Sequence, residues 1–554
     1  MNRKLKRVIF TACSLIAVGG LTGGIYNSLG KTVPAAAIDK VEESITIEDL
    51  SGGVVGSFMD SELKADPIEV STIAIQGIEY SIFNKNGSVK EYEEKNFPMF
   101  NKKYSDVDGV LTFRGDNLRT SPAFGVANIR EMKLKEEWSM ETSSSSWGGG
   151  AGWTGQPSII KWPEEVKGIM NLKDEYKNKV DFTEVVYASL DGRIYFLDLQ
   201  TGRRTREPIN IYNPIKGSVA LDPRGYPLLY VGQGISESGR IGYRIFSLID
   251  GKELYFIEGI DKTAYRGWGA FDSAPIIDKE KDTMLLAGEN GLFYNIKLNT
   301  VFNKGKKTIS IAPEVTKYRY KISGNSYQGI ENSIAAYKNL AYFADNGGSV
   351  QCLNLKTMKP VWTFNNGDDT DSTITIEVKG DIPYIYTANE VDKQGSKGKA
   401  YLRKIDGITG KLVFEEAYEA MSLLGEHPVN GGVLATNVIG KKDLSNLVIF
   451  NVARYKEFNA GLIVALNSET GEEAWKLEIP NYCWSSPVDV YDSRGKGYLI
   501  QGDSIGNLYL IEGKSGKILN TINLGSNIES SPAVFNNTIV LATRGGKIFG
   551  IRVE

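Results

Sequence analysis

The stretch Tyr187-Ala-Ser-Leu-Asp-Gly-Arg-Ile-Tyr-Phe-Leu-Asp-Leu-Gln-Thr-Gly202 decides the fold of this chain, because it recurs in degenerate form along most of the sequence. It returns as Leu499-Ile-Gln-Gly-Asp-Ser-Ile-Gly-Asn-Leu-Tyr-Leu-Ile-Glu-Gly-Lys-Ser-Gly516. Each copy has a short apolar run, a turn with glycine, an alternating run and a second turn, a pattern that predicts consecutive β-hairpins. Self-similarity at a period of roughly 40 to 60 residues indicates a repeat architecture.

Eight segments resemble one another at the point where each repeat would begin its innermost strand. They contain small residues and often a proline, which is tolerated at the first residue of a strand. The segments begin at Thr154, Lys216, Asp272, Glu331, Asp371, Val429, Trp484 and Glu529. Their spacing is that of four-stranded blades, so the sequence predicts an all-β, eight-bladed β-propeller. Seven blades are the alternative if the segment at Val429 does not begin a blade.

The last blade lacks an outermost strand of its own, because the chain ends at Glu554 directly after an apolar run. An upstream segment, Leu134-Lys-Glu-Glu-Trp138-Ser-Met140, parallels the outer-strand segment Thr470-Gly-Glu-Glu-Ala-Trp475. We therefore expect the strand around Trp138 to pair with the last blade and close the ring, which removes two open sheet edges.

Residues 1–33 predict a membrane anchor or a signal peptide. Basic residues at positions 3, 4, 6 and 7 precede an apolar, glycine-interrupted run of about 18 residues, which is longer than the core of a signal peptide. We favour a retained transmembrane helix with the propeller on the extracytoplasmic side. Cleavage at Pro34-Ala-Ala-Ala37, giving a secreted protein, is the alternative. Residues 34–106 predict a stalk or a small β element, with an alternating stretch from Ile68 to Ile75, and the propeller is expected to span 107–554.

The turn Asp198-Leu-Gln-Thr-Gly202, its relatives in other blades and the tryptophan that follows, as in Trp475, resemble the pyrroloquinoline-quinone-like repeat propellers. The segment Phe113-Arg-Gly-Asp-Asn-Leu-Arg-Thr resembles the lead-in that precedes such propellers. The resemblance covers about four-fifths of the chain and implies the fold. Dehydrogenases of this family hold the quinone against a tryptophan and a vicinal disulfide, with Ca²⁺ on Glu, Asn and Asp. This chain has no adjacent cysteines and only a partial ligand match at Glu331-Asn332.

Composition excludes several functional classes. A net charge of −3 provides no basic face for nucleic acid. The only histidine is His427, and the three cysteines have neither metal-binding spacing nor a disulfide pattern. The motif Gly-x-Ser-x-Gly and the P-loop are absent. No catalytic residue or bound cofactor is therefore predicted.

Four carboxylates among the leading residues of the eight segments predict a cation site. Propeller geometry would place Asp272, Glu331, Asp371 and Glu529 around one mouth of the central channel. Oxygen ligands of this kind suit Ca²⁺. The alternative is a solvated polar rim whose charge is offset by Lys216.

Aromatic residues in glycine-rich loops predict a binding face. Trp147, Trp153, Trp268, Tyr327 and Trp484 all fall in connections between blades, which a propeller gathers on one face. Such residues bind peptide or carbohydrate when they are exposed, and they stabilise blade packing when they are buried.

Together these patterns predict a non-enzymatic scaffold at the cell envelope. We expect it to bind another envelope protein or a cell-wall polymer, as the non-catalytic members of the resembling family do with proteins. A quinone- and Ca²⁺-dependent dehydrogenase is the first alternative, and a polysaccharide-binding propeller is the second.

Overall fold

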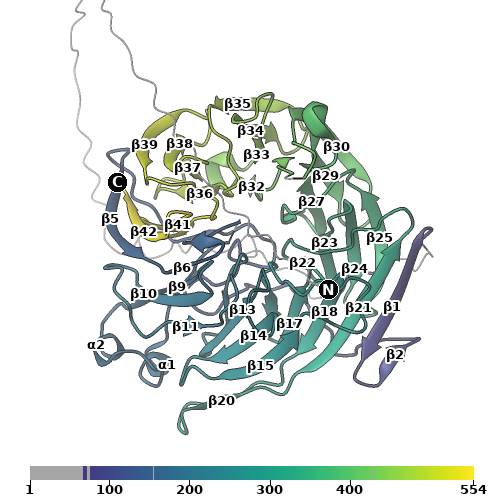
Figure 1. Cartoon of the computed structure of the whole chain (residues 1–554), viewed down its shortest axis with the longest axis vertical. Helices are drawn as coiled ribbons and strands as arrows, with labels where there is room; N and C mark the ends of the chain where they lie inside the picture. Colours follow the sequence, from purple (N-terminus) through teal and green to yellow (C-terminus); the bar gives the residue numbers. More distant parts are fainter. Residues whose placement is uncertain (1–65, 71–74, 154, 427) are drawn as a thin grey trace, which may run out of the picture. The chain divides into compact units, whose positions relative to one another are not determined.

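Eight antiparallel sheets surround a central axis in the computed structural model of the chain (Figure 1). The structure describes residues 66–70, 75–153, 155–426 and 428–554, which belong to one compact unit. Each sheet is one blade that extends from a short innermost strand near the axis to an outermost strand at the rim. The eight-bladed architecture predicted from the repeat is therefore confirmed.

The first four blades follow one another along the chain, from the innermost to the outermost strand. Blade one contains β8 (Ser158–Lys161), β9 (Thr183–Ala188), β10 (Arg193–Asp198) and β11 (Ile209–Asn210), with the short helices α1 (Glu164–Lys167) and α2 (Asp174–Lys177) between β8 and β9. Blade two contains β12 (Ala220–Leu221), β13 (Leu228–Gly232), β14 (Gly242–Ser247) and β15 (Glu253–Glu258). Blade three contains β16 (Ile276–Asp278), β17 (Thr283–Ala287), β18 (Leu292–Lys297) and β21 (Glu314–Ile322), with the hairpin β19 (Val301–Asn303) and β20 (Thr308–Ser310) inserted before β21. Blade four contains β22 (Ala335–Tyr337), β23 (Leu340–Ala344), β24 (Ser349–Asn354) and β25 (Lys359–Asn365).

The remaining blades complete the ring. Blade five contains β26 (Thr375–Lys379), β27 (Ile382–Ala388), β29 (Gly398–Asp406) and β30 (Leu412–Ala420). Blade six contains β32 (Val438–Ile439), β33 (Leu447–Ala453), β34 (Gly461–Asn467) and β35 (Glu473–Ile479), extended by β28 (Glu390–Val391) and β31 (Gly431–Gly432). Blade seven contains β36 (Val488–Tyr491), β37 (Gly497–Gly502), β38 (Asn507–Glu512) and β39 (Ile518–Asn523). Blade eight contains β40 (Ala533–Phe535), β41 (Thr538–Thr543), β42 (Lys547–Val553) and β5 (Leu134–Glu141). Single-turn 3₁₀ helices lie at Gly395–Lys397 and Lys442–Leu444, and the hairpin β6 (Ser144–Ser145) and β7 (Gly148–Gly149) follows β5.

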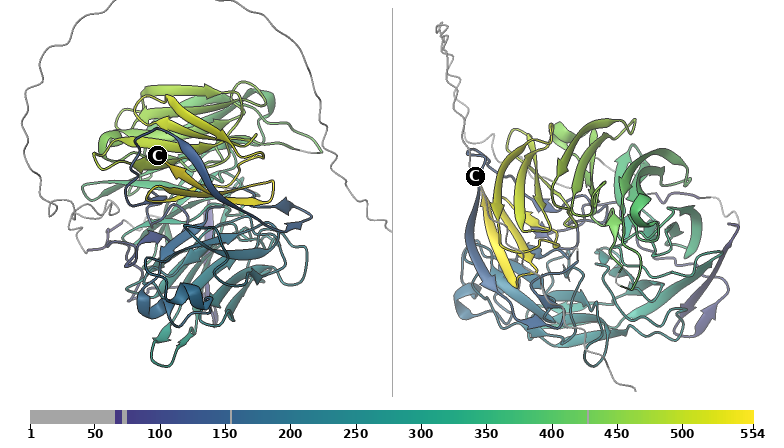
Figure 2. Two further views of the ribbon diagram at one scale, coloured as in Figure 1. Left: turned by 90° about the vertical axis from the view of Figure 1, so that its left-hand side faces the viewer. Right: turned by 45° about the horizontal axis from the view of Figure 1, so that its top comes forward.

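The ring closes as the sequence predicted, because β5 pairs with β42 at the C-terminal end of the chain (Figures 1 and 2). Trp138 lies opposite Gly550 in this pairing. Its Nε1 donates a hydrogen bond of 2.9 Å to the carbonyl oxygen of Leu199 in blade one, and its ring covers Gly202. A side chain at Gly202 would collide with that ring. Closure therefore uses both strand pairing and a tryptophan docked on the next blade.

The same tryptophan contact recurs at two other blade junctions. Trp362 of blade four donates to the carbonyl of Gly407 over 2.8 Å, and Trp475 of blade six donates to that of Gly513 over 3.0 Å. The acceptors lie in the glycine-containing turns of blades five and seven. The repeat turn and the repeat tryptophan therefore form one structural element, which joins neighbouring blades.

Residues 109–124, the central plug, hydrogen-bond in all eight blades to the innermost strand or to the residue directly before it. The plug begins at β3 (Gly109–Val110), which pairs with β8 of blade one, and ends at β4 (Ala123–Phe124), which pairs in parallel with β40 of blade eight. Backbone or side-chain bonds join Leu111 to blade two, Thr112 to blade three, Asn117 to blade four, Leu118 to blade five, and Arg114 to blades six and seven. The lead-in segment thus satisfies polar groups that the innermost strands present to the axis.

Two buried arginines carry many of the plug's contacts. Arg114 and Arg119 are both fully buried, and both adopt positive φ angles that non-glycine residues rarely hold. Arg119 donates through Nε to the carbonyl of Ile334 over 2.8 Å and through Nη2 to that of Ala274 over 2.8 Å, in blades four and three. Burial lowers the pKa of both guanidinium groups to about 10, so they remain charged at neutral pH. These bonds offset the cost of the unusual backbone conformation.

The predicted start of blade six was wrong. The segment at Val429 does not begin blade six, whose innermost strand β32 follows Leu434 instead. Gly432 has a φ of +80° and pairs with Glu390 of β28, which turns this part of the chain away from the axis. The small residues after Val429 resemble the repeat pattern, but Leu434 is the residue that begins the segment before the innermost strand of blade six.

The structure describes only part of the segment that precedes the propeller. The predicted anchor or signal peptide, 1–33, lies outside the described residues, as do 71–74 of the alternating stretch. Nowhere in the described ranges is there a helix with the length and apolar character needed to cross a membrane. Within 34–106, the hairpin β1 (Ile78–Asn84) and β2 (Gly87–Val89) pairs with β21 and widens blade three. This small β element is therefore continuous with the propeller sheet.

We predict that Arg119→Lys lowers the free energy of unfolding by about 3 kcal/mol. Lysine keeps the positive charge, but it lacks the separate N–H donors of the guanidinium group that bond to blades three and four at the same time. Equilibrium denaturation with urea would measure the loss. Arg240→Lys is the matched control, since Arg240 is exposed and pairs only with Glu258 among the described carboxylates. Equal stability of the two variants would contradict a holding role for the plug.

Candidate functional site

The connections that precede the innermost strands define one face of the propeller, here termed the mouth face. Because the four strands of a blade are antiparallel, the turn between the second and third strands lies on this face as well. The turn between the third and fourth strands, which accepts the tryptophan bond, lies on the opposite face. The mouth face therefore gathers residues from every blade around the channel.

A belt of hydroxyl groups fixes the start of the innermost strands. Each innermost strand is preceded by one of the repeat segments that begin at the leading residues. The third residue of such a segment donates its backbone N–H to the side-chain hydroxyl of the third residue in the segment of the next blade. Six such bonds measure between 2.8 and 3.2 Å, and their acceptors are Ser218, Ser333, Thr373, Thr436, Ser486 and Ser531. This belt holds the leading residues in a defined circle, which explains the Ser and Thr of the repeat.

A small cavity of about 20 Å³ lies in the circle of leading residues. Its lining includes Lys216, Asp272, Asp371 and Leu434, together with Phe113 of the central plug. Because Phe113 contributes to the cavity and the plug bonds to every blade, the channel is closed beneath the mouth. A ligand could approach this site only from the mouth face.

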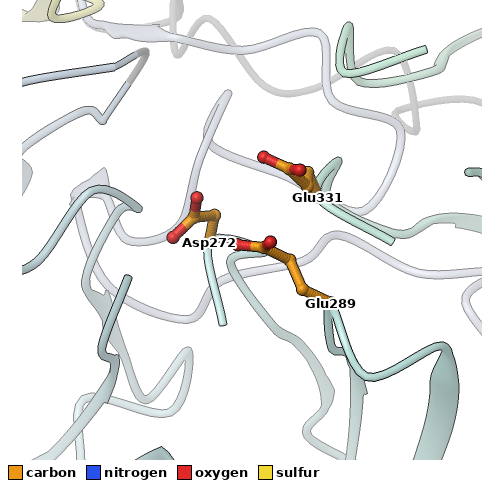
Figure 3. Close-up of side chains that lie close together, drawn as sticks. All are labelled: Asp272, Glu289 and Glu331. Atoms are coloured by element: carbon orange, nitrogen blue, oxygen red, sulfur yellow. The ribbon is translucent and has the colours of Figure 1, made fainter. Parts of the chain in front are cut away.

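On one side of the cavity, three carboxylates surround an ammonium group. Lys216 Nζ lies 2.5 Å from Asp272 Oδ2, 3.6 Å from Glu289 Oε1 and 3.9 Å from Glu331 Oε2. Figure 3 shows the three carboxylates, which come from blades three and four. Nζ also lies 4.6 Å from the centre of the Trp153 ring. We term these four charged residues the lysine cluster.

Burial and mutual repulsion shift the ionisation of the lysine cluster. Burial raises the pKa of Asp272, against the opposing effect of Lys216. Burial and then the charge of Glu331 raise the pKa of Glu289 well above its ordinary value. Burial alone would lower the pKa of Lys216, but the carboxylates hold it well above its usual range. The ammonium group is therefore charged at any physiological pH.

A second group of carboxylates, here termed the acidic cluster, consists of Asp369, Asp371 and Glu390. One oxygen from each lies within 4.8 Å of the others. Asp369 and Asp371 precede the innermost strand of blade five, and Glu390 follows that blade's second strand. Burial raises the pKa of all three carboxyl groups well above the ordinary values. Asn430 donates to Glu390 over 3.1 Å, and Asn346 to Asp369 over 3.4 Å.

The four carboxylates predicted to share a cation site fall into three separate settings. Asp272 and Glu331 belong to the lysine cluster, and Asp371 belongs to the acidic cluster. Glu529 accepts from the backbone N–H of Trp153 over 3.0 Å and lies 3.8 Å from Arg544. Burial raises its pKa, with Arg544 opposing. Glu529 is thus paired with an arginine and is absent from both carboxylate clusters.

Three further carboxylates, Glu289, Asp369 and Glu390, were missed by sequence reasoning. Glu289 directly precedes the Asn290-Gly291 turn, which the repeat pattern places on the mouth face. The position of Glu289 directly before this turn could therefore have indicated, from the sequence alone, that it lies at the mouth. Glu390 has no such signal, because the insertion before β29 breaks the turn pattern of blade five.

The predicted aromatic residues divide into two groups. Trp153 and Trp484 lie beside the cavity mouth with their ring centres 6.1 Å apart, and Trp484 Nε1 is buried without a hydrogen-bond partner. Trp147, Trp268 and Tyr327 are exposed by 43%, 46% and 56%. The loops of the mouth face carry further exposed apolar side chains, namely Tyr212, Ile260, Tyr265, Leu423, Leu424 and Ile505. Most of the large exposed hydrophobic residues in the described ranges therefore lie on this face.

Comparisons with known proteins agree with this architecture. Residues 459–554 match the family model described as outer membrane protein assembly factor BamB. The chain is similar to quinohemoprotein alcohol dehydrogenase from Comamonas testosteroni, at 13% identity and a TM-score of 0.55, over 80% of each chain. It is similar at 11% identity and a TM-score of 0.53 to the quinohemoprotein alcohol dehydrogenase ADHIIG from Pseudomonas putida HK5, over 80% of each chain. BamB from Moraxella catarrhalis matches at 18% identity and a TM-score of 0.47, over 76% of this chain and 98% of that one. No curated protein matches the chain.

These findings agree with the fold described above. The solved structures share its fold, and the matched family model covers its last blades. The last blades, within residues 459–554, therefore match a family of propeller repeats, and the chain as a whole has the β-propeller fold.

We predict that Lys216→Met lowers the free energy of unfolding by about 3–5 kcal/mol at pH 8 and by less at pH 4. The folded protein holds protons on Asp272 and Glu289 that the unfolded chain releases above about pH 4, so stability falls as the pH rises. In the wild type, the positive charge of Lys216 offsets this loss of stability at high pH, because it stabilises the ionised carboxylates. Thermal unfolding at the two pH values would measure the difference, with the exposed Lys252→Met as control. A loss independent of pH would contradict the role assigned to Lys216.

Proposed function

We propose that this chain is an exported, membrane-anchored and non-enzymatic β-propeller that acts as a protein-binding or assembly scaffold at the cell envelope. The basic, apolar N-terminal segment supports export and anchoring. The match of residues 459–554 to a family described as an outer membrane protein assembly factor supports an assembly role. The partner would be another envelope protein.

The observation that carries this proposal is the concentration of exposed apolar side chains on the mouth face. Trp147, Trp268 and Tyr327 come from three different junctions between blades. Exposed aromatic residues gathered on one face are typical of protein-binding surfaces, because they bury a large area with little loss of conformational entropy. A rigid propeller presents them without reorganisation.

The chemistry of the cavity supports a role without quinone. Pyrroloquinoline quinone is a tricarboxylate, and the two clusters bring six carboxylates to the cavity mouth, where Lys216 is the only described lysine or arginine that forms an ion pair with them. Two like-charged groups in a buried site repel strongly. The described cysteines, Cys352 and Cys483, are buried and unpaired in different blades. These features support a function that does not use the quinone.

Site-directed photo-crosslinking tests the scaffold proposal in intact cells. A photoreactive phenylalanine analogue at Trp268 or Tyr327 should give discrete adducts with one envelope protein. The matched controls are Ile382 and Leu412, which are exposed and apolar but begin strands on the opposite face. We expect no adduct from these positions.

Three outcomes of this experiment would contradict the proposal. Equal adducts from both faces would mean that the mouth face has no special role. No protein adduct from the mouth face, combined with retention of the chain on isolated cell-wall polysaccharide, would favour the carbohydrate-binding alternative. Reduction of a dye by the purified full chain with an alcohol and added quinone would favour the dehydrogenase.

A further inference from the structure

We propose that the acidic cluster, Asp369, Asp371 and Glu390, is a binding site for a calcium ion. The ion would lie at the mouth of the central cavity, where loops of blades four, five and six meet. The inference does not depend on the scaffold function, because ion binding requires no partner protein.

Unpartnered oxygens point to the ligand. Asp369 Oδ1, Asp371 Oδ1 and Glu390 Oε1 are each buried and accept no hydrogen bond from an N–H or O–H donor in the described part of the chain, and the Asp371 and Glu390 carboxyl groups interact directly with each other. Glu390 is 0% exposed, so water does not solvate its free oxygen. A buried carboxylate oxygen without a donor is costly, and here three occur within one cluster. A cation is the group that would satisfy all three together.

The lysine cluster provides an internal comparison. It also has three carboxylates, whose oxygens lie within 4.8 Å of one another, but Lys216 supplies a positive charge among them. For the acidic cluster, no lysine or arginine of the described ranges forms an ion pair with any of the three carboxylates. The nearby Lys393 is turned toward Asp368 and toward the Tyr327 ring. The same protein therefore balances one cluster with its own ammonium group and leaves the other for an external cation.

Local structure holds the three side chains in place for an ion. Glu390 belongs to β28, and its backbone N–H donates to the carbonyl of Asp369 over 2.8 Å. Asn430 donates to Oε2 of Glu390 and Asn346 donates to Oδ2 of Asp369, which leaves Oε1 and Oδ1 of these residues without a donor. Neutral amide donors orient the carboxylates without neutralising them. Second-sphere contacts of this kind are typical of metal sites.

The donor set selects calcium among common ions. All three ligands are carboxylate oxygens, and neither of the two described cysteines belongs to the group, which disfavours zinc and copper. Magnesium retains its water shell and needs near-ideal octahedral geometry, whereas calcium accepts irregular oxygen sites and dehydrates readily. The buried and irregular arrangement of these side chains therefore fits calcium.

Calorimetric titration of the full-length protein with CaCl₂, after removal of divalent ions with EDTA, tests the site. We expect one ion per chain, with a dissociation constant in the range of about 10⁻⁴ to 10⁻³ M that extracellular calcium modules show. Glu390→Gln and Asp371→Asn should each weaken binding at least about tenfold. Glu289→Gln, which removes a carboxylate from the lysine cluster, is the matched control and should change the affinity less than about twofold.

Thermal unfolding supplies a second readout that also reports folding. Calcium should raise the melting temperature of the wild type and of Glu289→Gln but not of Glu390→Gln or Asp371→Asn. The Gln and Asn variants should fold without calcium, because each removes a repulsive buried charge. The proposal would be overturned by wild-type protein that neither binds nor is stabilised by about 10 mM Ca²⁺. Unchanged binding by the acidic-cluster variants, or an equal shift with Mg²⁺, would overturn it as well.

Discussion

The hydrogen bonds between the central plug and the innermost strands are the constraint on which the rest of this structure depends. A ring of eight blades leaves backbone groups of its innermost strands facing the axis, and those groups need partners. Residues 109–124 supply them, and Arg114 and Arg119 each reach more than one blade. The plug therefore fixes the innermost strands of the blades. The belt of hydroxyl bonds on the mouth face and the tryptophan contacts on the opposite face then join neighbouring blades to one another.

The plug also determines what the site can do. Because it closes the channel, the mouth becomes a shallow, blind cavity rather than a passage through the ring. Leading residues from several blades converge there, and their carboxylates are buried to an extent that requires compensation. Lys216 compensates one cluster from within the chain. The exposed aromatic residues lie around this cavity, so the apolar surface and the charged site share one face.

Much of the fold could be predicted from the sequence, because it depends on local and repeated signals. The glycine turns, the tryptophan after them and the parallel between Trp138 and Trp475 were sufficient for the blade number and the closure. The start of blade six was misplaced at Val429, since its small residues satisfy the pattern while the pairing of Gly432 with β28 does not. The plug and the grouping of carboxylates were beyond sequence reasoning. The plug depends on contacts between residues hundreds of positions apart, such as Arg114 with Pro487, and the carboxylate clusters depend on how the loops of neighbouring blades meet at the mouth.

Hydrogen exchange of the full-length protein, followed by mass spectrometry, tests the central claim most directly. If the plug holds the ring, peptides within 109–124 should exchange as slowly as the innermost and second strands of the blades, through global unfolding alone. The loops of the mouth face should exchange much faster. Rapid exchange of the plug, while the blade strands remain protected, would show that the ring is stable without it and would contradict this account.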